Sequence, residues 1–199
     1  MTTSDINFAS LLASRLCHDV VGPVGAIQNG LELMAEDEAM TEMALDLVRK
    51  SARQASAKLQ FARMAYGAAG GAEVLDPAEA GRLTADMFAG ERASLDWQWT
   101  GDAAPRAVVK IAMLLATFAL TGVPRGGTVT VTREGGGVCV DAASDTVRTP
   151  PFSELLDGGT VDDPRAVQPF MIAQLAEANG MRIEVAGRDG GIAFRTVAA

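Results

Sequence analysis

The first third of the chain carries two long stripes of apolar residues at helical spacing. Between Leu16 and Met34, apolar side chains recur every three or four residues, which places them on one face of an α-helix. A similar stripe runs from Leu45 to Tyr66, after a short acidic turn at residues 36–38. Two such stripes joined by a short loop predict an antiparallel helical hairpin. The stripe residues are Leu16, Val20, Val24, Ile27, Leu31 and Met34 in the first helix, and Leu45, Val48, Ala52, Ala55, Leu59, Ala62 and Tyr66 in the second.

A lone hairpin of this kind leaves much of its apolar surface open to water. Dimerisation, in which two hairpins form a four-helix bundle, would cover that surface. The alternative is that the hairpin packs only on the C-terminal half of its own chain. The glycine-rich segment at residues 67–72, GAAGGA, predicts a linker between two domains, although it could also be an ordinary loop within one domain. The predicted domains are residues 1–69 and 73–199.

From residue 73 onward the pattern changes to a mixture of helix and strand. Asp76 is a candidate N-cap for the first of these helices, and Gly180 is placed to end the last one. The segment EGGG at residues 134–137 predicts a β-hairpin turn. The predicted fold class is α+β, with a helical hairpin followed by an α/β sandwich whose sheet is built largely from hairpins. Helices are predicted at 77–89, 105–121 and 164–179, and strands at 94–100, 128–133, 138–142, 182–186 and 192–197.

Composition and charge narrow the classes of function. The chain has 199 residues, of which 48% are apolar, so it can bury a core. Its net charge of −8 argues against nucleic acid or an anionic membrane as the main partner. With one histidine, and with Cys17 and Cys139 lacking neighbours at zinc spacing, no metal site is expected. The sequence shows no signal peptide and no apolar run of roughly 20 residues, which predicts a cytoplasmic protein without a membrane span.

The single histidine, His18, is the strongest candidate for chemistry. Because a helix turns about 100° per residue, His18 lies about 160° from Leu16 and Val20 and should face solvent. An imidazole nitrogen can attack an acyl phosphate to form a phosphoramidate, and the neighbouring Asp19 carboxylate can hold the other ring nitrogen as N–H. Pro23 should kink or break the helix just past the histidine. On spacing alone, a solvated His–Asp surface pair and a proline that ends a helix remain the alternative.

The local motif resembles a known phosphoacceptor site. Residues 18–23, HDVVGP, are similar to the histidine box of sensor histidine kinases, where an acidic residue follows the histidine and proline stands five positions on. The longer stretch at residues 11–33, LLASRLCHDVVGPVGAIQNGLEL, resembles the alphaproteobacterial histidine phosphotransferases, and this similarity extends over nearly the whole chain. The resemblance implies a homodimer that accepts phosphate on His18 from the receiver domain of a CckA-like hybrid kinase. It then passes the group to CtrA-like and CpdR-like response regulators, which implies a place in cell-cycle regulation.

Parts of the second half resemble the ATP-binding domain of histidine kinases, at residues 112–131, 172–185 and 190–197. The nucleotide-binding residues differ, however. Thr117 and Phe118 stand where the kinase has its Mg²⁺-binding asparagine, residues 141–145 (DAASD) lack both glycines of the kinase motif, and residues 167–170 (VQPF) replace the lid glycines. Such glycines let backbone N–H groups approach phosphates, and such an asparagine anchors the metal.

These losses predict a degenerate ATPase-like fold that neither binds nor uses ATP. Asp141 is then structural, and the turn at residues 125–127 is a loop rather than a phosphate cradle. No cofactor is expected on this chain, and the resemblance implies that catalytic Mg²⁺ belongs to the partner's receiver domain. Gly22 replaces the Thr or Asn with which many kinases orient a hydrolytic water, which favours reversible transfer over hydrolysis. The open alternatives are an ATP-dependent histidine kinase and a non-catalytic dimeric scaffold.

Receiver sites are rich in carboxylates, so basic residues near His18 could steer a partner. Arg15 is the best placed of these on the first helix, and Leu11 is an apolar residue on the same face. The basic stretch on the second helix is either a docking surface or an ordinary solvated face; it consists of Arg49, Lys50, Arg53, Lys58 and Arg63. The predicted catalytic residues are His18 and Asp19, and the predicted docking residues are Leu11, Arg15, Val21, Gly22, Pro23, Gly25 and Asn29.

Overall fold

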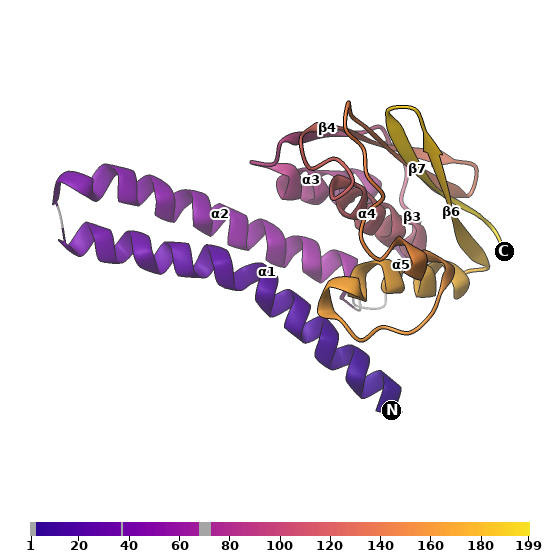
Figure 1. Ribbon diagram of the computed structural model, residues 1–199, viewed down its shortest axis with the longest axis horizontal. Helices are drawn as coiled ribbons and strands as arrows, with labels where there is room; N and C mark the ends of the chain where they lie inside the picture. The colour runs from indigo at the N-terminus through magenta and orange to yellow at the C-terminus, as the bar shows by residue number, and fades with distance from the viewer. Residues whose placement is uncertain (1–2, 37, 68–72) are drawn as a thin grey trace.

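The computed structural model describes residues 3–36, 38–67 and 73–199. Helices α1 (Thr3–Glu36) and α2 (Thr41–Ala65) form a long antiparallel hairpin, joined through the short 3₁₀ turn η1 (Glu38–Met40), and its loop end projects away from the rest of the molecule (Figure 1). The predicted hairpin is confirmed. The two helices approach closely at Gly30, where an added Cβ would lie 2.6 Å from Val48 Cγ2.

Helix α1 continues through Pro23, so of the two outcomes that we expected, a kink or a break, the break does not occur. The ribbon instead changes direction along its course (Figure 1). Proline removes one helical N–H and its ring crowds the carbonyl four residues earlier, and a long helix accommodates both effects by bending. Helix α1 packs against α2, and it also contacts η3 and α5.

The α/β region is built on a five-stranded sheet with the order β2-β4-β5-β7-β6. Strand β2 (Ala93–Trp97) pairs in parallel with β4 (Gly127–Glu134), and all the other neighbours are antiparallel. The turn at residues 134–137 joins β4 to β5 (Gly137–Ala143), and β6 (Met181–Arg188) forms a second hairpin with β7 (Gly191–Ala198). The α+β class with a largely hairpin-built sheet is therefore confirmed.

A second, two-stranded pair was not predicted from the sequence. Strand β1 (Val74–Leu75) pairs with β3 (Ala104–Pro105), directly before helix α4. Two-residue strands are too short to show an alternating pattern, which explains why the sequence did not reveal them.

Three helices pack on the sheet and face the hairpin. They are α3 (Pro77–Phe88), α4 (Arg106–Leu120) and α5 (Val167–Glu177), which is preceded by the 3₁₀ turn η3 (Pro164–Ala166). Asp76 caps α3 as predicted, because its carboxylate accepts a bond of 2.8 Å from the Ala78 N–H. The short 3₁₀ turn η2 (Ser153–Asp157) packs against α5.

The main core lies around α4, which is buried along most of its length. Its largest fully buried side chains include Ile111, Leu114 and Leu115 on the helix and Phe194 on the sheet. Phe61 and Ala65 near the end of α2 belong to this same core. The core therefore includes residues on both sides of the predicted domain boundary. This shared burial holds the end of α2 against the α/β region.

The predicted linker lies mostly outside the described residues, because only Gly67 of residues 67–72 is described. The Lys110 ammonium donates a hydrogen bond to the Gly67 carbonyl from helix α4. Burial lowers the pKa of Lys110, and the nearby positive charge of Arg106 lowers it further. The division into residues 1–69 and 73–199 stays a prediction.

Candidate functional site

His18 lies on α1 with its side chain open to solvent. The imidazole is 87% exposed, as the helical angle predicted. Gly22, one turn further along, and Gly25 would each meet no atom within 4 Å if a Cβ were added. Val21 is 68% exposed. A large partner could therefore reach the imidazole without displacing any neighbouring side chain.

The other predicted docking residues differ in accessibility. Asn29 is exposed and Leu11 is half-buried. Pro23 is buried, so a partner could not contact it directly, contrary to our expectation. The reason is angular: Pro23 follows His18 by five residues and so lies about 140° around the helix from it.

The Asp19 carboxylate is held between the imidazole and a guanidinium. Asp19 Oδ1 lies 3.6 Å from His18 Nδ1, slightly further than a hydrogen bond allows. Asp19 Oδ2 accepts a bond of 2.9 Å from Arg15 Nε, one turn earlier on α1. Arg15 therefore fixes the carboxylate, and one oxygen is left facing the imidazole.

We had expected Arg15 to steer a partner, but its guanidinium is already engaged within the chain. It is half-buried and reaches the α/β region, where Nη1 donates to the Arg165 carbonyl and Nη2 to Gln168 Oε1, both at 3.4 Å. The Gln168 side chain is buried and donates to the Leu114 carbonyl at 2.7 Å and to Thr117 Oγ1 at 2.8 Å. A continuous chain of polar contacts thus runs from Asp19 to helix α4.

Aromatic packing supports the same seam between α1 and α5. The rings of Phe8 and Phe170 lie 5.5 Å apart between centroids. Sequence reasoning missed this seam because its partners are separated by roughly 150 positions, as the contacts of Arg15 show. The one available signal was Gln168, a polar residue between the apolar residues Val167 and Pro169 at the start of α5.

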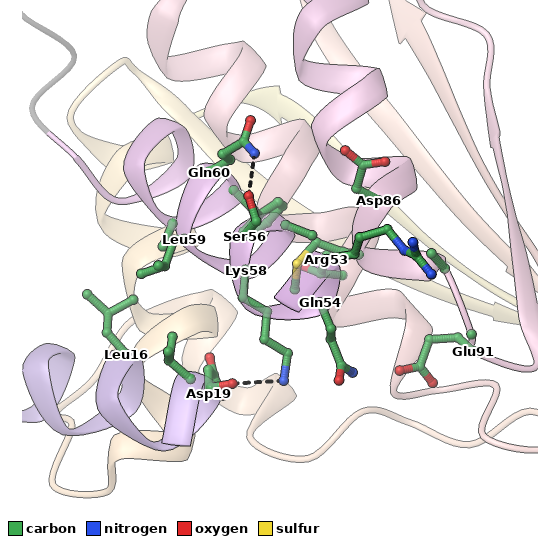
Figure 2. A pocket seen from close by; sticks show the side chains of 18 of the residues that line it. Leu16, Asp19, Arg53, Gln54, Ser56, Lys58, Leu59, Gln60, Asp86 and Glu91 are labelled. Carbon is green, nitrogen blue, oxygen red and sulfur yellow. Dashed lines mark hydrogen bonds between the residues drawn. The ribbon is translucent and has the colours of Figure 1, made fainter. Parts of the chain in front are cut away.

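Lys58 reaches the same site from α2. Its ammonium donates a hydrogen bond of 2.8 Å to the backbone carbonyl of Asp19 (Figure 2). The other four members of the basic stretch, Arg49, Lys50, Arg53 and Arg63, are exposed. Lys58 therefore differs from its neighbours, because it is half-buried and contacts the helix that carries the histidine.

A cleft of about 960 Å³ opens beside this contact, between the hairpin and helices α3 and α4. Arg53 and Lys58 line it on the α2 side, and Asp86 and Glu91 line it from α3 and the turn that follows (Figure 2). Tyr66 also lines the cleft, and burial raises its pKa to about 12. Arg15 partly offsets that rise in the pKa, whereas the Asp19 carboxylate adds to it.

The residues that align with the nucleotide-binding segments of kinases instead make contacts within this chain. The Asp141 carboxylate accepts from Arg188 at 2.5 Å and 3.2 Å in a two-pronged ion pair. Gly127 in the 125–127 turn has φ of +145°, and an added Cβ would lie 2.2 Å from the Ala143 carbonyl oxygen. Residues 167–170 start helix α5 instead of forming a glycine-rich lid. Among the described residues, no group of three or more His, Cys, Asp or Glu side chains is arranged to hold a metal ion.

The fold and site together define a class: a helical hairpin with a solvent-facing histidine, packed against an α/β region. Comparisons with known proteins agree with this class. The family model for the histidine phosphotransferase C-terminal domain matches residues 77–191. The protein phosphotransferase ChpT of Brucella abortus (strain 2308) is 38% identical over 194 residues, covering 93% of this chain and 92% of that protein. A solved structure of a bacterial phosphotransferase superposes with a TM-score of 0.89 at 35% identity, covering 99% of this chain and 98% of the other.

This chain belongs to the histidine phosphotransferase family, and it is a phosphotransferase.

Proposed function

We propose that His18 is the phosphoryl carrier of a phosphorelay. Its imidazole accepts the group from an aspartyl phosphate on the receiver domain of a hybrid kinase and later gives it to the receivers of response regulators. The observation that carries this proposal is the 87% exposed imidazole on an open helix face, with a carboxylate oxygen 3.6 Å from Nδ1. The identities of the receivers, CckA-like as donor and CtrA-like or CpdR-like as acceptors, rest on the sequence resemblance.

The proposed chemistry uses the two ring nitrogens differently. Because Nδ1 faces Asp19, the proton stays on Nδ1 and Nε2 carries the free lone pair. Nε2 attacks phosphorus, the bond from phosphorus to the receiver's aspartyl oxygen breaks, and that aspartate leaves as a carboxylate. The reverse reaction on a second receiver restores the neutral imidazole. We expect Mg²⁺ to be held by the receiver.

Asp19 orients the ring in this proposal, and the surface around His18 receives the partner. A carboxylate beside Nδ1 stabilises positive charge that develops on the imidazole as Nε2 bonds to phosphorus. The docking residues that we propose on this exposed face are Leu11, Val21, Gly22, Gly25 and Asn29. Arg15 acts by holding Asp19, because its guanidinium is already engaged.

Phosphate transfer from an isolated phosphorylated receiver tests the proposal. The wild-type chain should acquire an acid-labile phosphate, and His18→Gln should acquire none. Asp19→Asn keeps the size of the side chain but loses the charge, and we expect the transfer rate to fall by about tenfold or more. Label on the His18→Gln variant would contradict the proposal. Label taken directly from ATP by the wild type would instead establish a kinase.

We further propose that the protein is a homodimer that works in the cytoplasm. Val24, Leu31 and Leu59 on the two hairpin helices are each at least half exposed in the single chain, which favours a second hairpin packed against them. Within residues 3–36, 38–67 and 73–199, no helix combines the length and apolar character that crossing a bilayer requires. In this proposal residues 1–69 carry dimerisation and transfer, and residues 73–199 form the degenerate ATPase-like part.

A further inference from the structure

Pro23 creates a specific problem for the helix that carries His18. In an α-helix, each carbonyl accepts a hydrogen bond from the N–H four residues later. The carbonyl of Asp19 would bond to the N–H of residue 23, but proline has none. A carbonyl left in this way beside a packed helix needs another donor, because an unpaired backbone group away from water is costly.

Lys58 supplies that donor. Its Nζ lies 2.8 Å from the Asp19 carbonyl oxygen, and both residues line the cleft (Figure 2). A hydrogen bond from an ammonium is stronger than one between neutral groups, and here it crosses from α2 to α1. Asp19 is therefore held twice: Arg15 holds its side chain and Lys58 holds its backbone.

We propose that Lys58 is a positioning residue for phosphotransfer, and that Pro23 is what makes it one. By binding the carbonyl that Pro23 leaves free, Lys58 fixes the turn of α1 that presents His18 and Asp19. The effect on transfer rests on the proposed function, whereas the dependence of Lys58 on Pro23 does not. In this proposal the proline does more than bend the helix. It leaves the Asp19 carbonyl, next to His18, free to accept a hydrogen bond from Lys58 of α2.

The test is a double-mutant cycle between the two residues. Lys58→Met keeps the aliphatic stem and removes the ammonium, and Pro23→Ala restores the missing N–H. With Pro23 present, Lys58→Met should slow transfer from a saturating phosphorylated receiver by about tenfold, the value of one charge-assisted hydrogen bond, and leave the receiver's Kd within about twofold. In the Pro23→Ala background the same change should slow transfer by less than about threefold, since the carbonyl then has its helical partner. Lys58→Arg should keep most of the rate.

Lys50 provides the matched control. It is an exposed lysine on α2 that lies eight residues before Lys58 and also borders the cleft. Lys50→Met removes the same charge from the same helix and should leave the saturated rate unchanged. Three results would overturn the proposal: an equal loss with Lys58→Met in both backgrounds, a loss confined to the receiver's Kd, or an equal loss with Lys50→Met.

Urea unfolding of the same variants separates this inference from the proposed function. The unfolding equilibrium constant should rise about tenfold with Lys58→Met when Pro23 is present, and much less in the Pro23→Ala background. If the wild type accepts no phosphate but this unfolding cycle shows the coupling, the proposed function fails while the Pro23–Lys58 link stands. If transfer occurs but neither cycle shows coupling, this inference fails while the proposed function stands.

Discussion

At the scale of single residues, Gly22 and Gly25 leave the helix face around His18 open. Packing does not require glycine at either position, because an added Cβ would meet no atom within 4 Å. Gly22 lies one turn from the imidazole and has open space where a side chain would stand. Gly30 on the same helix is different, because its missing side chain makes room for α2. These two glycines therefore have separable effects, one on access to His18 and the other on packing.

Gly22→Ala should stabilise the protein and impair transfer. Alanine in a helix interior is favoured over glycine by about 0.5–1 kcal/mol, so the Tm should rise. The new methyl group stands one turn from His18 on the face that a receiver approaches in the proposed function, and we expect kcat/KM for a phosphorylated receiver to fall severalfold. Gly30→Ala is the matched control: it places Cβ 2.6 Å from Val48 Cγ2 and should destabilise the hairpin by about 1–3 kcal/mol. Full transfer activity in the Gly22→Ala variant would show that partners do not approach over this residue.

The only tyrosine offers a pH-dependent probe beside the site. Burial raises the pKa of Tyr66 to about 12 from its ordinary value of 10.0, so the folded state favours the protonated phenol. The stability that this contributes is complete below pH 10 and is lost as the pH rises from 10 towards 12. Absorbance at 295 nm should show the phenol titrating near pH 12 in the native protein and near pH 10 in urea. Tyr66→Phe should remove this part of the alkaline loss of stability, and native titration near pH 10 would contradict the burial.

At the scale of elements, helix α1 is tied to both of its neighbours at the turn that carries the histidine. Lys58 connects it to α2, and Arg15 connects it to α5 through Gln168. The N-terminal half of α1 therefore contacts the α/β region as well as α2. Asp19 is thus in contact with residues of α1 and α2, and through Arg15 it is linked to α5.

Arg15→Ala should weaken the attachment of α1 to α5. We expect unfolding in urea to require about 1–2 kcal/mol less free energy, because the Asp19 carboxylate and the Gln168 side chain lose a shared donor. A double-mutant cycle with Gln168→Ala should show coupling, since the two side chains are in contact. Arg15→Lys should not restore the stability, because an ammonium cannot reach the three acceptors that the guanidinium fork spans. Arg63→Ala, at an exposed arginine on α2, is the control and should leave the free energy of unfolding nearly unchanged. Additive effects of Arg15→Ala and Gln168→Ala would contradict the link between the two side chains.

At the scale of the whole molecule, the apolar surface of the hairpin determines the expected assembly. Val24, Leu31 and Leu59 are 50%, 54% and 56% exposed in the single chain. Each such side chain contributes about 1.5–3 kcal/mol when it is fully buried, so covering several of them favours association. The α/β region covers the base of the hairpin but leaves these positions open.

Leu59→Glu should convert the dimer to a monomer. Sedimentation equilibrium of the wild type should give twice the chain mass of 20.7 kDa, and the variant should give the chain mass itself. A charge at this position would have to be desolvated in a bundle, which is costly. Val185→Glu is the control: this residue is also exposed, at 43%, but lies on strand β6 and should leave the dimer intact. A wild-type mass of one chain would contradict the proposed dimer.

The sequence by itself determined the features that follow from local periodicity and local chemistry. The apolar stripes predicted the hairpin, the angle around the helix placed His18 in solvent, and Asp76 predicted the start of α3. These succeeded because they depend on residues within one or two helical turns of each other. The β4–β5 hairpin was accessible for the same reason, since its turn is continuous in sequence.

Only the tertiary structure decided what surrounds the histidine. Arg15 was expected to steer a partner, yet it binds residues roughly 150 positions away. Pro23 was expected to contact a partner, yet it is buried, and of the predicted kink or break only the break is excluded. A proline inside a helix leaves one carbonyl without its helical partner, but only the packing of α2 against α1 shows that Lys58 binds the carbonyl of Asp19. The exposure of a helix face is a property of the helix, whereas the partner of a freed backbone atom depends on which element the fold brings beside it.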